Sequence, residues 1–188
     1  AQAGSMENFT DEHVQAALDA VQASVDAGQI RAFTGNEYVE DLASGNLIAA
    51  MAWSGDVFQL QLDNPKLEFV IPEEGGELWS DNLVVPAGAT HKTNAEKLMD
   101  WYYQPEVAAE LAAWVNYISP VPAAKDAMLA LADEEEADDP EWADELRELA
   151  ESPAIFPSGD YLSNVGIARD FTSEEETEYE QAWNEIVN

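Results

Sequence analysis

The sequence predicts an α/β fold, because segments with the pattern of buried strands alternate with segments of helical periodicity. The almost unbroken apolar run NLIAAMAW ends at Trp53 and is typical of a strand covered on both faces. Two further strand candidates, Leu67–Pro72 and Leu83–Pro86, flank a Gly-Gly turn. We expect Leu47–Trp53 and Leu67–Pro72 to be neighbouring strands of one sheet, and the apolar run that ends at Trp53 to deliver its SGD turn to the ligand crevice of that sheet.

Capping residues predict where the helices begin. Thr10 precedes an apolar helical period that Gly28 ends, and Asn36 precedes a short helix that Gly45 ends. Later starts combine Ser or Thr with a Glu three residues on, or place Pro in the first turn. These starts are Thr93 with Glu96, Pro105, Asp139 with Pro140, and Thr172 with Glu175. We expect the last helix to pack through Tyr179, Ala182, Trp183 and Ile186.

The charge balance excludes two classes of partner. Asp and Glu number 39 against 7 Lys and Arg, which gives a formal net charge of −32. Such a surface repels phosphate backbones and anionic lipid heads, so we expect neither nucleic acid nor a membrane surface as a partner. With 46% apolar residues the chain can nevertheless bury a core. Most of the acids therefore form a solvated coat suited to high solubility or high salt.

Motifs for catalysis and cofactors are absent from the sequence. There is no Cys, no GxGxxG, no phosphate-binding loop with its Lys and no HExxH, so the sequence implies no cofactor. His13 and His91 lack partners at the spacing of a triad or a metal pair. An acidic enzyme that uses a carboxylate pair remains an alternative, although no pattern singles out such a pair. We therefore predict binding and not catalysis.

The acidic run from Ala132 to Asp144 is predicted to be a solvated loop that leads into the helix at Pro140. Its carboxylates are of the type that binds Ca²⁺. The spacing differs from that of an EF-hand loop, and no Gly stands where that loop turns. We therefore expect no specific metal site.

Aromatic and acidic residues come together near the predicted strand ends. Trp79 and Asp81 are two residues apart, so their side chains project to the same side of an extended chain. A Trp face beside a carboxylate suits an organic ammonium, because the ring provides cation–π and methylene contact while the carboxylate accepts charge-assisted hydrogen bonds. The alternative is structural: Trp53 would close the core, and Trp79 would pack beside a turn.

Three stretches occur in an order that carries a family resemblance. They are GNLIAAMAWSGDV, FVIPEEGGELWSDNLVVP and KLMDWYYQPEVAAELAAWVNYISPVPAA, within Asn36 to Met128. Together they resemble the spermidine/putrescine-binding proteins of ABC importers, which are periplasmic-type solute-binding proteins. The family reads GYPTP where this chain reads NYISPVP. Carried over residue by residue, the resemblance implies that Trp53, Trp79, Asp81 and Tyr117 line a polyamine site, with Asp81 on an amine and the rings around the methylene chain.

The resemblance also implies a periplasmic-binding-protein-like fold of type II, with two α/β lobes and the ligand in the cleft between them. We expect a fragment that lacks most of the N-terminal lobe. Residues 1–80 would belong to the second lobe, residues 81–118 would cross to the first lobe and return, and residues 119–188 would pack back on the second lobe as a helical segment.

The implied partners are a polyamine and the membrane permease subunits of an ABC transporter, with the full-length form a monomer. The opening AQAGSMENFT has neither an initiator Met nor a targeting signal. The resemblance implies an exported protein of the periplasm or the outer face of the membrane, whose signal or lipid anchor would lie upstream. Another small cation or a metal complex is the alternative ligand, since solute-binding folds change ligand through few positions.

Overall fold

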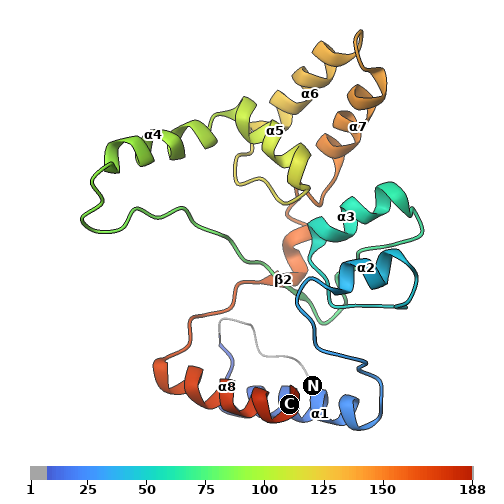
Figure 1. Cartoon of the computed structure of the whole chain (residues 1–188), viewed down its shortest axis with the longest axis vertical. Helices are drawn as coiled ribbons and strands as arrows, with labels where there is room; N and C mark the ends of the chain where they lie inside the picture. Colours follow the sequence, from blue (N-terminus) through green and yellow to red (C-terminus); the bar gives the residue numbers. More distant parts are fainter. Residues whose placement is uncertain (1–7, 188) are drawn as a thin grey trace. The chain divides into compact units, whose positions relative to one another are not determined.

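The computed structural model describes residues 8–187, and these divide into two compact units. Unit 1 takes in residues up to Tyr38, Val70–Ser80 and the chain from Asn164 onward, whereas unit 2 comprises Val39–Phe69 and Asp81–Ser163. Most regular structure is helical, with one small sheet among the described residues (Figure 1). No helix among residues 8–187 has the length and apolar character needed to cross a bilayer.

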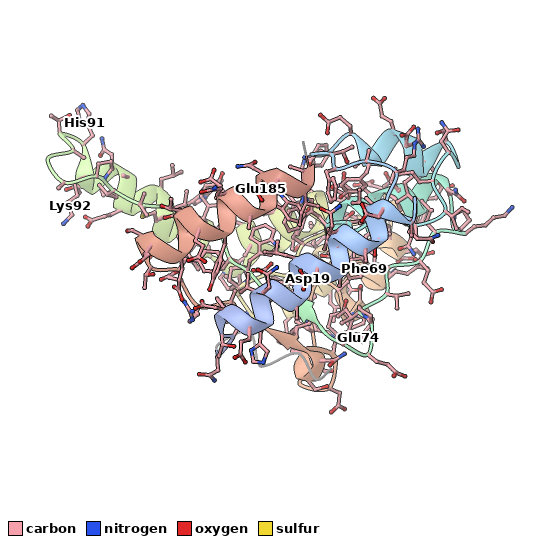
Figure 2. All side chains as sticks on the ribbon, turned by 90° about the horizontal axis from the view of Figure 1, so that it is seen from below. Asp19, Phe69, Glu74, His91, Lys92 and Glu185 are labelled. Carbon is pink, nitrogen blue, oxygen red and sulfur yellow. The ribbon has the colours of Figure 1, made fainter. Side chains whose placement is uncertain are left out.

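Unit 1 is built on two helices and a parallel strand pair. Helices α1 (Asp11–Asp26) and α8 (Ser173–Val187) lie next to each other, as Figure 2 shows with Asp19 and Glu185 labelled on them. Strand β1 (Gly76–Glu77) pairs in parallel with β2 (Val165–Gly166). The backbone N–H of Leu78 donates to the Gly166 carbonyl at 2.8 Å, which extends the pairing by one bond.

The predicted helix starts of unit 1 are confirmed. At α1 the backbone N–H of Thr10 donates to Nδ1 of His13 at 3.1 Å. At α8 the backbone N–H of Thr172 donates to Oε2 of Glu175 at 2.8 Å, and the backbone N–H of Glu175 donates to Oγ1 of Thr172 at 3.3 Å. These reciprocal bonds satisfy donors that a helix leaves unpaired at its start.

Unit 2 holds the other helices and the main core. They are α2 (Tyr38–Ala43, which begins at the unit boundary), α3 (Ser54–Asp63), α4 (Lys92–Tyr102), α5 (Pro105–Val115), α6 (Ala124–Glu135) and α7 (Pro140–Glu151), followed by the 3₁₀ turn η1 (Tyr161–Asn164). Helices α5, α6 and α7 pack together around Met128, Leu146 and Ile155, which are almost completely buried (Figure 1). Alanines on all three helices let the backbones approach closely.

In unit 2 the predicted starts of α5 and α7 are confirmed and that of α4 is corrected. Helix α2 begins at Tyr38, two residues after Asn36, SGD is the first turn of α3 and not a turn after a strand, and α3 and α6 are helices that the sequence analysis does not predict. Pro105 begins α5, and Oδ1 of Asp139 accepts a bond from the backbone N–H of Trp142 at 3.1 Å, as predicted. Helix α4 begins earlier than predicted, because the His91 carbonyl already accepts bonds from Asn94 and Ala95, which places Thr93 inside the first turn. The first residues of the acidic run, through Glu135, belong to α6 and not to a loop.

The three predicted strands are wrong for the described chain. Leu47–Trp53, Leu67–Pro72 and Leu83–Pro86 lie outside helices and strands, and Ile48 and Met51 are 105% and 99% exposed instead of buried. An apolar run does not by itself form a strand, because a strand requires backbone hydrogen bonds to a neighbouring strand. The assignment of residues 1–80, 81–118 and 119–188 to lobes stays a prediction.

Replacing Met128 by Ala should lower the free energy of unfolding by about 2–5 kcal/mol, because a fully buried side chain leaves a cavity in the α5–α7 core. Met51→Ala is the matched control, since its side chain is exposed. Urea unfolding followed by circular dichroism measures both. Equal destabilisation by the two substitutions would contradict this assignment of the core.

Candidate functional site

Tyr117 lies against the first turn of α3, and this helix begins directly after Trp53. Trp53 has extended backbone and is the N-cap residue of α3, and its carbonyl accepts a bond from the backbone N–H of Val57 at 3.3 Å. The phenol of Tyr117 donates to Oδ1 of Asp56 at 3.3 Å. Trp53 as a whole residue is 47% exposed. An aromatic surface, a carboxylate and a phenol therefore share one helix start.

Gly55 makes this arrangement possible. It is buried in the first turn of α3, and a Cβ atom at this position would come within 2.2 Å of Cε2 of Tyr117. No side chain larger than hydrogen fits there without moving the ring. The glycine of the WSGD sequence is therefore required by a contact with a residue far away in the chain.

Asn116 sets the direction in which the chain leaves α5. It has a φ of 56°, in the left-handed region that Asn tolerates better than most residues, and it is buried. Its backbone N–H donates to the Ala112 carbonyl at 3.0 Å and its side-chain amide donates to the Ala113 carbonyl at 2.9 Å. This cap ends α5 and places Tyr117 at α3.

A second bond ties α3 to the end of α5. The side-chain amide of Gln59 donates to the Val115 carbonyl at 3.2 Å.

Burial of the phenol, followed by the charge of Asp56, raises the pKa of Tyr117 to about 12. The phenol therefore stays protonated, and acts as a hydrogen-bond donor, well above neutral pH.

The four predicted site residues fall in different parts of the structure. Trp53, Asp81 and Tyr117 belong to unit 2, whereas Trp79 belongs to unit 1, where it follows the β1–β2 pairing. Trp79 is 43% exposed, and Asp81 is exposed in a segment without regular structure. The structure places Tyr117 beside the start of α3 and leaves the roles of all four residues as proposals.

Sequence reasoning placed the SGD turn, which contains Gly55 and Asp56, at the ligand crevice, but it assigned no role to these two residues or to Asn116. Asp56 could have been identified from the sequence. It lies in the first turn of the helix that follows Trp53, so it is close to any ligand that Trp53 contacts. The contact of Gly55 and the left-handed turn of Asn116 had no such signal in the sequence, since both depend on the packing of α3 against the end of α5.

The acidic run before Pro140 is held by an arginine. Arg147 pairs with Asp133 at 3.1 Å, with Glu136 at 2.6 Å and with Asp144 at 3.3 Å. Within residues 8–187 no group of three or more His, Asp or Glu side chains is placed to bind a metal ion.

Comparison with known proteins identifies the class. The model of the bacterial extracellular solute-binding protein family matches residues 1–144, and the chain belongs to this family. Its members are solute-binding proteins and not enzymes, which confirms that prediction.

The names of individual relatives also give the solute that those proteins bind. The spermidine/putrescine-binding periplasmic protein of Salmonella typhimurium is 32% identical over 119 residues, which cover 63% of this chain and 34% of that protein. The putrescine-binding periplasmic protein PotF of Escherichia coli is 28% identical over 142 residues, covering 72% and 34%. These similarities confirm the resemblance inferred from the three sequence stretches.

Solved structures show the fold. A candidate spermidine/putrescine ABC transporter from Listeria monocytogenes superposes with a TM-score of 0.75 at 25% identity, covering 96% of this chain and 50% of that one. The substrate-binding protein PotD of Streptococcus pneumoniae gives a TM-score of 0.71 over the same shares. This confirms the predicted fold class, an α/β fold of the periplasmic-binding-protein type. The chain spans half the length of these two solved structures.

Replacing Gly55 by Ala should force the Tyr117 ring away from α3. We expect a loss of about 1–3 kcal/mol in stability from overpacking, and a fall in the Tyr117 pKa from about 12 toward its ordinary value of 10.0. Alkaline titration by NMR of ring-labelled tyrosine measures the pKa.

Gly159→Ala is the control for this substitution, because a Cβ atom there meets open space.

The raised pKa of Tyr117 also determines how the stability of the native protein depends on pH. Since the folded pKa lies above the unfolded one, the stabilisation by the protonated phenol is complete below pH 10 and is lost between pH 10 and about 12. An unchanged Tyr117 titration in Gly55→Ala would contradict the contact.

Proposed function

We propose that this chain is part of a protein that binds a polyamine such as spermidine or putrescine and delivers it to an ABC importer. The observation that carries the proposal is the start of α3, where Trp53, Asp56 and Tyr117 bring an aromatic surface and a carboxylate together. The relatives that are named for spermidine or putrescine binding support this choice of ligand.

The proposed ligand is a chain of methylene groups that carries an ammonium at each end. Such a molecule needs apolar walls for its methylenes as well as carboxylates for its charges. In the proposal Trp53, Trp79 and Tyr117 provide the walls and Asp81 accepts from an ammonium. A carboxylate surface alone would attract the same molecule only as it attracts salt ions.

Asp56 is a second candidate acceptor in this proposal. Its Oδ1 accepts the Tyr117 phenol, and a carboxylate has further acceptor positions that an ammonium can use. The phenol would then hold the carboxylate in one orientation, which lowers the entropy lost on binding.

The proposed place of action is outside the cytoplasmic membrane. Relatives from Salmonella typhimurium and Escherichia coli are periplasmic proteins. In the proposal this protein is exported as well, carries its polyamine in a cleft between two lobes, and docks as a monomer on the membrane permease subunits of its transporter.

Asp81→Asn should weaken polyamine binding by about 2–5 kcal/mol, because it removes the charge that an ammonium in a water-poor site requires. The measurement is titration calorimetry with putrescine, spermidine and spermine on the longest natural protein that carries these residues, since this chain spans about half the length of its solved relatives. The 188-residue chain alone should show only weak, salt-sensitive association.

The matched control is Asp138→Asn, which removes the same charge from an exposed position in the acidic run. Charge reversal of several acids between Glu134 and Asp139 should likewise leave binding nearly unchanged at physiological salt, where screening acts within about 8 Å. If the parent protein binds polyamines no better than any polyanion does, the proposed function is wrong. Tight binding of another amine instead would replace the ligand and retain the class.

Trp79→Ala should weaken binding by roughly 1–3 kcal/mol through the loss of ring contact. The preference among putrescine, spermidine and spermine should also become smaller, because the ring fixes where the methylenes lie. Trp114→Ala is the control, since Trp114 is 83% exposed on α5. A Trp79 variant with unchanged affinity and selectivity would remove this residue from the site.

A further inference from the structure

Helices α1 and α8 pack with little apolar burial. Neither helix contains a fully buried residue. Trp183 of α8 contacts Phe33, which lies beyond the end of α1, with ring centroids 5.2 Å apart, and the two residues remain 39% and 40% exposed. The hydrophobic contribution to this pairing is therefore small, because it scales with the apolar area removed from water.

The same two helices bring like charges together. The acids of α8 are Glu174, Glu175, Glu176, Glu178, Glu180 and Glu185, and the helix contains no Lys or Arg. Those of α1 are Asp11, Glu12, Asp19 and Asp26, again without Lys or Arg. Asp11 and Glu12 from α1 line one surface hollow together with Glu178 from α8. Packing of α8 on α1 therefore costs electrostatic free energy.

Repulsion also acts within each helix. Glu174 with Glu178, and Glu176 with Glu180, are four residues apart on α8, a spacing at which like charges destabilise a helix. Asp26 ends α1, where the helix dipole disfavours an anion.

Few cations of the protein oppose these charges. In the sequence of unit 1 the basic residues are Arg31 and Arg169. Arg169 binds Glu175 through two bonds of 2.6 and 3.0 Å, and its guanidinium lies 4.0 Å from the centroid of the Phe9 ring. This pairing lowers the pKa of Glu175 to about 2, so the carboxylate stays charged at any ordinary pH.

We propose that unit 1 is an ionic-strength switch, in which α8 packs stably on α1 only when dissolved cations screen the carboxylates of the two helices. Screening acts over about 10 Å at 0.1 M salt and about 3 Å at 1 M, so the repulsion within and between the helices falls over this range while the short hydrogen bond from Tyr179 to Asp11 remains. The inference concerns the folding of unit 1 and is independent of the proposed ligand.

The α6–α7 pair of unit 2 provides an internal comparison. Met128 and Leu146 are completely buried there, and Arg147 and Lys125 bind acids of the two helices. Apolar burial and these ion pairs stabilise the α6–α7 packing, so its stability should depend much less on salt.

Hydrogen exchange of backbone amides tests the switch on the 188-residue chain, because it reports each helix separately. Between about 0.1 M and 1 M NaCl, exchange in α8 should slow on the order of tenfold, whereas exchange in α6 should change much less. Equal exchange in α8 at the two salt concentrations would overturn the proposal.

Charge-removing variants separate screening from the general effect of salt on apolar burial. Glu178→Gln with Glu180→Gln should slow α8 exchange at low salt and flatten its salt response, because these substitutions remove part of the repulsion. Glu110→Gln with Glu148→Gln removes the same charge from exposed positions on α5 and α7, and should leave the α8 response unchanged. Sucrose, which favours burial without screening, should stabilise α8 equally in all three proteins. A full salt response in the Glu178/Glu180 variant would contradict the switch.

Discussion

The arrangement of the candidate site depends on the apolar packing of α5 against α6 and α7. This packing fixes the end of α5, where Asn116 takes a left-handed conformation and directs Tyr117 toward α3. The ring then fits over Gly55, and the phenol binds Asp56. The apolar core thus decides where the Asp56 carboxylate and its donor Tyr117 meet, because a side chain can be held precisely only where its backbone is already fixed.

Both units carry an excess of acidic residues, and they offset the repulsion between the carboxylates in different ways. In unit 2 a buried core stabilises α6 and α7, and Arg147 binds Asp133, Glu136 and Asp144 around them. In unit 1 the pairing of α1 with α8 relies on the hydrogen bond from Tyr179 to Asp11, while Arg169 binds Glu175 at the start of α8. A carboxylate coat is compatible with folding wherever burial offsets repulsion, so the balance differs between parts of one chain.

The acid coat and the proposed binding site also differ in kind. An exposed carboxylate attracts any cation weakly and loses this attraction as salt is added. The start of α3 combines a carboxylate with a positioned phenol and an aromatic ring, and through these groups the proposed site would distinguish an organic ammonium with methylene groups from a simple ion. In the proposed site, recognition would therefore depend on the aromatic residues as much as on the charge.

The sequence by itself determined the helix starts that local bonds control, such as Thr172 with Glu175 and Asp139 before Pro140, because a cap involves residues only a few positions apart. It also determined the family, since the three stretches keep their order and spacing. It did not determine whether apolar runs such as Leu47–Trp53 form strands, which requires a hydrogen-bonded neighbour. Only the tertiary structure decided that Gly55, Asp56 and Tyr117 meet, because residues far apart in the chain come together through packing that no local pattern records.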